Sequence, residues 1–415
     1  MKGMILGLLV VSIILVGGIS GCGEKKALNE NPVLAKGSLS NVIEANNQFS
    51  LDLYSEYSSK DDKNVFFSPY SISSALAMTY EGARGKTAEE MQDVLHFPND
   101  TGKMRSDFVS INKELNKADK TYKLSVANAL WAQKDYPFLQ DYLNTVEQTY
   151  GGKATNLDFK TDTENSRVTI NRWVEDKTND KIKDLIPPRV LSDATRLVLT
   201  NAIYFKANWT DKFEMEATYD ADFNLASKTS IKVPMMHQTS DFNYMENNAL
   251  QILEMDYQGN DLSMLVLLPK ENNLSGLEDS INLKNLDAWK KELNSTKVEV
   301  SLPKFKFETK YFMADDLKSM GMPAAFSDDA DFSGMTGKKD LKISQVIHQT
   351  FINVSESGTE AAAATAVIMV ASSVGPGEPQ PQPKIFNADH PFMFLIQEKS
   401  TGTILFMGRV NDPSK

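Results

Sequence analysis

Two kinds of apolar pattern follow one another along this chain of 415 residues, and their order restricts the fold that it can adopt. From Asn41 the pattern is helical, because apolar residues recur at a four-residue step. These residues are Ala45, Phe49, Leu53 and Tyr57. Buried strands are predicted later, at 197–205, 262–268 and 298–307 and in a C-terminal hairpin of 392–397 and 403–408. Helices gather early, strands dominate late, and no regular strand–helix–strand alternation occurs, so the predicted class is α+β.

Two local signals refine this outline. Residues 64–67 form a predicted short buried strand, and Ser68 follows as the N-cap of a helix with Pro69 at its first position. A second helix is predicted over 168–181, where it carries Trp173.

The amino-terminal segment combines an apolar run at 4–16 with small residues that lead into Cys22, the only cysteine. This order resembles a bacterial or archaeal lipoprotein signal, in which lipid is attached to the cysteine sulfur and the chain is cleaved before it. A short uncleaved membrane anchor is the alternative. Either interpretation places the rest of the chain outside the cytoplasm. The predicted organisation is a signal peptide at 1–21, a lipid anchor and flexible tether at 22–40, and a folded domain at 41–415.

Charge and reactive side chains argue against several functions. A net charge of −11 and a pI near 5.1 disfavour nucleic acid as a partner, because phosphate binding requires a basic face. The chain has no P-loop, dinucleotide-binding or GxSxG motif, and its scattered histidines match no zinc-protease pattern. These histidines are His96, His237, His348 and His390. We therefore predict no cofactor and no metal, while a surface hydrolase whose triad has no local signature stays an alternative.

Residues 356–384 break the pattern of helices and strands. An alanine run and a small apolar stretch come first, and a tract rich in glycine, proline and glutamine follows at 375–383. The proline-rich half cannot join the interior of a sheet and favours extended, solvated backbone. Long irregular segments inside a compact domain are uncommon and often functional, so we expect the function to reside here.

Four stretches in order along the chain resemble the serpin family of serine protease inhibitors. They are Asn64–Ile72, Leu199–Trp209, Glu356–Thr365 and Phe386–Ile396. The similarity runs through essentially everything after residue 41, and the signal segment suggests a prokaryotic, lipoprotein-type member. The resemblance implies a serpin fold, with mostly N-terminal helices packed on a large central mixed sheet, two further sheets, and an exposed reactive-centre loop at about 356–384.

The family implies suicide inhibition of a protease, not catalysis. The protease cuts the loop, the loop inserts into the central sheet as a new strand, and the acylated protease is dragged along and distorted. Insertion requires alternate side chains of residues 358–371 to be buried. With Thr359 facing inward, the buried set is Thr359, Ala361, Ala363, Thr365, Val367, Met369 and Ala371. None of these residues is charged. Insertion requires this, because a buried unpaired charge is strongly destabilising.

The resemblance also assigns roles around the loop. The hinge consists of Glu356, Gly358, Thr359, Glu360, Ala361, Ala362, Ala363 and Ala364. The shutter, a buried polar cluster beneath the sheet opening, consists of Ser68, Ser71, Asn201 and His348. The breach, where the loop first inserts, consists of Trp209, Lys304 and Glu356. A hinge of small residues favours an inhibitor over a non-inhibitory member of the family.

The family's usual spacing from the hinge glutamate places the scissile bond between Ser372 and Ser373, with cleavage after Met369, Ala371 or Ser373 as nearby alternatives. Residues 359–383 contain no arginine or lysine, so a trypsin-like protease has no side chain to grip. Small residues suit elastase-like or subtilisin-like serine proteases, and a papain-like cysteine protease is a weaker alternative.

The predicted partner is thus a protease, held as a covalent acyl-enzyme complex by a monomeric inhibitor that the lipid on Cys22 attaches to the cell membrane. The alternative is a protein with the same fold and no inhibitory activity, namely a surface carrier or binding lipoprotein. A complex that survives boiling in detergent separates the two, because a mere substrate is cleaved without trapping the protease.

Overall fold

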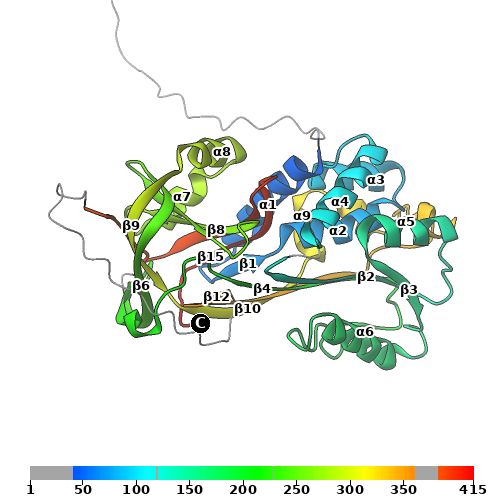
Figure 1. Ribbon diagram of the computed structural model, residues 1–415. Coiled ribbons are helices and arrows are strands. Elements are labelled where there is room, and N and C mark those ends of the chain that lie inside the picture. The colour runs from blue at the N-terminus through cyan, green and yellow to red at the C-terminus, as the bar shows by residue number, and fades with distance from the viewer. Residues whose placement is uncertain (1–40, 118–119, 228, 360–381) are drawn as a thin grey trace, which may run out of the picture. The chain divides into compact units, whose positions relative to one another are not determined.

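Strand pairing in the computed structural model divides the strands between two sheets (Figure 1). The structure describes residues 41–117, 120–227, 229–359 and 382–415. All of these residues belong to one compact unit. Within these ranges no helix has both the length and the apolar character needed to cross a membrane.

The central sheet has six strands and is mixed, because β11 runs parallel to β4, and β2 parallel to β3, while the remaining pairs are antiparallel. In spatial order the strands are β10 (Phe305–Phe312), β11 (Gln345–Ser355), β12 (Gly358–Thr359), β4 (Leu197–Asn208), β2 (Lys123–Gln133) and β3 (Lys153–Leu157). The predicted strand at 197–205 is β4, which continues a few residues further.

The second sheet has nine strands, and its long strand β6 joins what are otherwise two smaller sheets. Its members are β1 (Val65–Phe67), β15 (Thr403–Val410), β14 (Phe392–Glu398), β8 (Leu262–Pro269), β7 (Leu250–Asp256), β6 (Ser230–Glu246), β9 (Asn294–Pro303), β13 (Lys384–Asn387) and β5 (Tyr219–Asn224). The strand at 64–67, the strand at 262–268 and the C-terminal hairpin are confirmed as β1, β8 and β14–β15.

Most of the long helices come early, as expected for this α+β class. They are α1 (Val42–Ser58), α2 (Pro69–Tyr80), α3 (Gly85–Leu95), α4 (Thr101–Leu115), α5 (Gln140–Tyr150) and α6 (Thr163–Lys177). Later ones are short: η1 (Met215–Ala217), α7 (Leu274–Ser280), α8 (Leu283–Glu292), α9 (Ala314–Met320), η2 (Pro323–Phe326) and α10 (Ser333–Thr336). Asn41 and Ser68 cap α1 and α2, each accepting from a backbone N–H three residues on. The predicted fold class is confirmed.

The bounds predicted for the Trp173 helix are wrong, because α6 begins before 168 and ends before 181. Its polar first turn has no apolar period, so the pattern does not reveal the start. At the other end Asn179 and Asp180 adopt positive φ angles of 53° and 57°, which terminates the helix.

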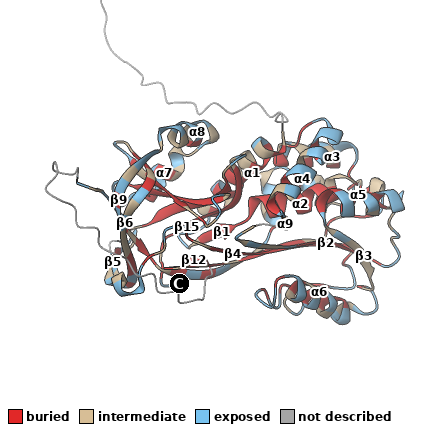
Figure 2. Ribbon diagram, in the orientation of Figure 1, coloured by how far each residue is buried: buried red, intermediate tan, exposed pale blue. Residues whose placement is uncertain are grey.

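Two apolar cores lie on opposite faces of the central sheet (Figure 2). The larger core fills the space between this sheet, the second sheet and α1 and α2. The smaller core lies between α6 and the sheet. There Ile170 and Val174 of α6 pack against residues of the sheet such as Trp131, Ala202 and Ile347. Part of the central sheet is therefore buried on both faces, so any strand added there needs side chains that fit two cores.

Candidate functional site

The junction between β4 and β11, which we call the seam, has two parts with different pairing. In the lower part the two strands pair directly and in parallel, from Gln345 opposite Val198 to Phe351 opposite Tyr204. In the upper part β12 lies between them, with Thr359 opposite Val354 on one side and Ala207 on the other. The first two residues of the predicted insertion segment thus already occupy the top of the seam.

A tight turn at 356–357 brings the chain from β11 back into the seam, and backbone contacts hold this turn. The Trp209 N–H donates to the Ser357 carbonyl at 3.0 Å, and the indole N–H donates to the Ser355 carbonyl at 3.0 Å. The Phe213 N–H donates to the Glu356 carbonyl, also at 3.0 Å. Trp209, predicted for the breach, therefore holds the turn through which the chain enters the seam.

Gly358 lies where only glycine fits. Its φ is +147°, in a region that residues with a side chain rarely adopt. A Cβ atom built there would lie 2.1 Å from the Ala207 carbonyl oxygen and 2.6 Å from the Asn208 Cα. The missing side chain therefore lets β12 approach β4 closely enough to pair with it.

Thr359 faces the core, as the predicted alternation requires. It is buried, and its hydroxyl lies 2.7 Å from the Tyr257 hydroxyl. The Tyr257 ring stacks on Trp209 with centroids 4.5 Å apart. Burial raises the pKa of Tyr257 well above its usual range, so the phenol stays protonated and can hydrogen-bond. Sequence reasoning did not identify Tyr257, since its position after β7 has no motif.

Glu356 and Lys304 form an ion pair at the same end of the seam, with Lys304 Nζ 2.9 Å from Glu356 Oε1. The Thr218 hydroxyl donates to the same oxygen at 3.0 Å. Glu356 is only 8% exposed. Burial opposes its ionisation, but the hydrogen bonds from Lys304, its own backbone N–H and Thr218 prevail and lower the pKa of the carboxyl. The breach prediction did not include Thr218.

A polar cluster lies on the α2 side of the lower seam and links both strands of the seam to the start of α2. Its members are Ser68, Ser71, Asn128, Asn201 and His348, all buried. His348 of β11 is directly opposite Asn201 of β4, and their side chains bond to each other. The Ser68 N–H donates to His348 Nε2 at 3.1 Å, so the neutral ring carries its proton on Nδ1 and donates to Asn201 Oδ1. The cluster thus ties the seam closed across its width.

His348 is fully buried, and burial lowers its pKa to about 3. The ring is therefore neutral at physiological pH and serves as a hydrogen-bonding element. The four residues predicted for the shutter lie together here.

Sequence reasoning missed Asn128 of β2, the fifth member of the polar cluster. Its amide oxygen accepts from Asn201, and its amide nitrogen donates to the Ser71 carbonyl at 3.3 Å. The signal was an amide in the middle of a buried apolar strand, where it requires partners.

Several predicted residues lie outside the described ranges. They are Cys22, Glu360, Ala361, Ala362, Ala363, Ala364, Thr365, Val367, Met369, Ala371, Ser372 and Ser373. Of the hinge, the structure describes Glu356, Gly358 and Thr359, and it places all three at the top of the seam.

The described residues offer no complete hydrolase triad around a histidine. The Ser301 hydroxyl lies 2.9 Å from His237 Nδ1, but His237 Nε2 is buried with no carboxylate or other partner among the described residues. His348 bonds to the backbone N–H of Ser68, not to its hydroxyl. The described parts of the chain also contain no group of three or more His, Cys, Asp or Glu placed to hold a metal ion.

Comparison with known proteins matches this architecture to one family. The family profile described as Serpin (serine protease inhibitor) matches residues 44–413. An uncharacterized serpin-like protein of Thermococcus kodakarensis is 43% identical and covers 98% of this chain and 98% of its own length. The human leukocyte elastase inhibitor is 42% identical over 89% of this chain and 98% of its own. The solved structure of human thyroxine-binding globulin with thyroxine has a TM-score of 0.82 at 33% identity, covering 90% of this chain and 99% of that one.

Proposed function

Because this chain belongs to the serpin family, we propose that it is a single-use protease inhibitor whose cleaved loop inserts into the seam between β4 and β11. One observation carries the proposal: β12 already lies between these strands and pairs with both. The next residues of the chain need only continue this pairing downward as β4 and β11 separate.

The register of β12 defines what each later residue meets. Thr359 is opposite Val354 and Ala207, so every further residue moves one position down both strands. By this count Glu360 comes level with Lys206, whose half-buried side chain can pair with it. Thr365 comes level with both His348 and Asn201, so its hydroxyl meets the polar cluster. Insertion therefore replaces the direct His348–Asn201 contact with one that a threonine can share.

Both faces of the inserted strand have to be compatible with a core. Odd-numbered residues follow Thr359 toward the larger core, and the set Ala361 to Ala371 has no charge. Even-numbered residues face the other way, and Ala364 comes level with Ala202 in the core beneath α6. Small side chains on both faces suit a strand that must enter an existing packing. Each added ladder hydrogen bond contributes about 1 kcal/mol. Full insertion gives a net gain on the order of ten such bonds, because two ladders replace one.

The target is proposed from the loop sequence and from one relative. The stretch before the proposed Ser372–Ser373 bond has no arginine or lysine, and its residues are small or apolar. The chain is 42% identical to a leukocyte elastase inhibitor. Both points support an elastase-like or subtilisin-like serine protease as the target, with Met369 and Ala371 as alternative cleavage positions and a cysteine protease as a weaker alternative.

We further propose that the inhibitor acts outside the cytoplasm, attached to the membrane by lipid on Cys22, with 1–21 removed and 22–40 as the tether. The support is the apolar run that ends at the only cysteine. Growth with a labelled fatty acid tests this attachment. The label is expected on the wild-type protein and absent from Cys22→Ser, and label retained in that variant contradicts it.

Trapping of a protease tests the inhibitor proposal directly. Purified protein mixed with elastase or subtilisin is expected to give a covalent complex that resists boiling in detergent. Thr359→Arg should abolish the complex while the loop is still cut, because the seam would have to bury an unpaired charge beside Tyr257. Ile385→Arg is the matched control, since this exposed β13 residue lies just after the loop and outside the seam.

Cleavage without trapping by the wild-type protein would contradict the proposal. It would favour the carrier alternative, because thyroxine-binding globulin, a protein of similar structure, binds a small molecule.

A further inference from the structure

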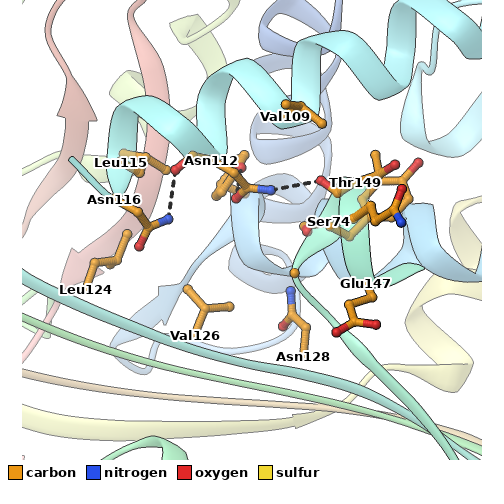
Figure 3. A pocket seen from close by; sticks show the side chains of 14 residues that line it. Ser74, Val109, Asn112, Leu115, Asn116, Leu124, Val126, Asn128, Glu147 and Thr149 are labelled. Carbon is orange, nitrogen blue, oxygen red and sulfur yellow. Dashed lines mark hydrogen bonds between the residues drawn. The ribbon is translucent and has the colours of Figure 1, made fainter. Parts of the chain in front are cut away.

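Four lysines share the face of the central sheet on which α6 lies. They are Lys123 of β2, Lys206 of β4, and Lys306 and Lys310 of β10, and we call them the lysine face. Alternation along β2 determines which way Lys123 points, because Leu124 and Val126 line a cavity against α4 and α5 on the opposite side of the sheet (Figure 3). Lys206 is directly opposite Lys123, so both lie on the α6 side.

The register of β10 and β11 places the other two lysines on the same side. Ile347 of β11 packs in the core next to α6, so the odd-numbered residues of β11 face α6. Lys306 is opposite Asn353 and Lys310 is opposite Gln349, and both partners are odd-numbered. All four lysines therefore project from one surface, where two of them are exposed and two are half-buried.

No carboxylate among the described residues forms an ion pair with these four ammonium groups. Lys123 Nζ donates to the Asn179 side-chain oxygen at 3.0 Å, and Lys310 Nζ donates to the Asp184 carbonyl at 2.8 Å, so both acceptors are neutral. Burial lowers the pKa of Lys310, although the charges of Glu308 and Asp184 oppose this effect. The described parts of the chain thus leave the positive charge of the lysine face without ion pairs.

Two of these charges also repel each other. Lys123 and Lys206 are directly opposite in antiparallel strands, where Cβ atoms are about 5 Å apart and like charges are destabilising. An anion that contacts both ammonium groups would relieve this repulsion. Because the net charge of the chain is −11, the lysine face is a positive region on an acidic protein, and a polyanion would be directed to it.

The spacing of the lysines favours an extended ligand over a single small anion. Asn353 and Lys206 come directly below the two residues that flank Thr359, so they lie at the same level with one strand position between them. Lys306 is opposite Asn353, which places Lys306 and Lys206 three strand spacings apart, or about 14 Å. A chain of linked anionic groups can span this distance, whereas one phosphate contacts only one end.

The aromatic side chains of this face offer no platform for bases. Lys306 Nζ lies over the Phe351 ring, 5.6 Å from its centroid. Tyr204, directly opposite Phe351, is only 4% exposed. Single-stranded nucleic acid gains much of its affinity by stacking on accessible aromatic rings. A phosphate chain without bases is therefore the better fit, since lysine binds phosphate as a compact point charge.

We propose that the lysine face binds a linear chain of phosphate groups, of the kind that inorganic polyphosphate presents. This inference concerns binding alone and is independent of the proposed function. It can therefore be tested whether or not the protein traps a protease.

The probe is long-chain inorganic polyphosphate with a fluorescent end label, titrated with the full, uncut protein and followed by anisotropy. A plot of log affinity against log salt concentration is expected to have a slope of about −2 to −3, as for contacts from these four lysines to a single-stranded chain. Lys206→Met and Lys306→Met should each weaken binding about threefold and make the slope shallower by about 0.7. Tripolyphosphate should bind about tenfold more weakly, because it is too short to connect the two lysines.

The matched control is Lys291→Met, which removes an exposed lysine of α8, outside the central sheet, and should change neither affinity nor slope. Equal losses in this control and in Lys206→Met would overturn the proposal, as would the absence of binding at low salt. Equal affinity for tripolyphosphate and the long chain would overturn it too. Tighter binding of oligothymidylate, dextran sulfate or vesicles with anionic lipid would assign the lysine face to that class of partner instead.

Discussion

The upper and lower parts of the seam involve the same two strands and are stabilised differently. At the top, β12 separates β4 from β11, and the turn before it is held by Trp209 and the Glu356–Lys304 pair. Below, the two strands pair directly over a buried polar cluster centred on His348 and Asn201. One strand pair thus shows both the separated and the joined arrangement.

This difference identifies what limits opening. The top uses a glycine whose φ and closeness to β4 disfavour any side chain, together with aromatic packing around Thr359, so the two residues of β12 are already held between β4 and β11. The lower part depends on hydrogen bonds between neutral groups, which another hydroxyl can satisfy. If the cut loop inserts as proposed, the lower part is the barrier, and the residues after Thr359 would replace the contacts between β4 and β11 there.

The largest expected effect comes from cutting the loop near Ser372. Insertion then extends the upper arrangement down the whole seam and replaces the direct β4–β11 ladder with two ladders, for a net gain on the order of ten hydrogen bonds. We expect the thermal unfolding midpoint to rise by about 10–20 °C. Scanning calorimetry of intact and cut protein, with the protease removed, measures this rise.

Two variants decide whether the seam causes that rise. Thr359→Arg should lose it, and Ile385→Arg should keep it. An unchanged midpoint in cut wild-type protein would mean that the lower seam does not accept the loop, and the comparison between its two parts would then describe shape alone.

Removing His348 should have the next largest effect. His348→Ala leaves the Ser68 N–H and the Asn201 amide oxygen without their partner, which we expect to cost about 3 kcal/mol in the free energy of unfolding. The control is His96→Ala, which removes a partly exposed histidine bonded to Asp52 and should cost less than about 1 kcal/mol. Urea denaturation of both compares them, and equal losses would show that the cluster does not hold the seam.

The pH dependence of stability gives a second test of the same cluster. The pKa of His348 is about 3 in the folded protein, below the ordinary 6.5, so the unfolded chain binds the proton first. Its contribution is present above pH 6.5 and is lost as pH falls toward 3, with a slope of about 1.4 kcal/mol per pH unit. His348→Ala should lack this slope. A variant that retains it would assign the slope to other groups.

The sequence predicted more of this seam than of its supports. Gly358, Thr359 and the shutter residues followed from motifs, and the structure places them at the seam because strand register is set by local pattern and short turns. Tyr257, Thr218 and Asn128 were missed because each meets its partner only after distant strands come together. The helix α6 was misplaced because its polar first turn has no apolar period and because the positive φ angles of Asn179 and Asp180 end it, neither of which the apolar pattern reveals.

Replacing Gly358 separates two causes of strain at the top. Gly358→Ala meets both an unfavourable φ and a clash with the backbone of β4, so we expect a loss of about 3 kcal/mol and weaker trapping. Gly402→Ala is the control, because Gly402 also has a positive φ, of +74°, but faces only the end of the Lys290 side chain. It should cost about 1 kcal/mol and leave trapping intact. Equal effects on trapping would show that close approach of β12 to β4 is unimportant.

The smallest expected effect concerns the Glu356–Lys304 pair, and it tests whether the top is held by charge or by packing. Hydrogen bonds lower the pKa of Glu356 below 4.5, so its contribution is present above that pH and is lost as pH falls through the lowered value. Lys304→Met should cost about 1 kcal/mol or less at pH 7, with the difference from wild type shrinking in acid.

The control for this pair is Lys318→Met, which breaks an exposed pair with Asp315 within α9 and should cost about 0.3 kcal/mol. Urea denaturation from pH 7 to pH 3 measures both. A loss above 3 kcal/mol in Lys304→Met would mean that charge holds the upper seam. A loss no larger than the control's would mean that Trp209, Tyr257 and the fit of Gly358 are sufficient, as the burial of Thr359 between two paired strands leads us to expect.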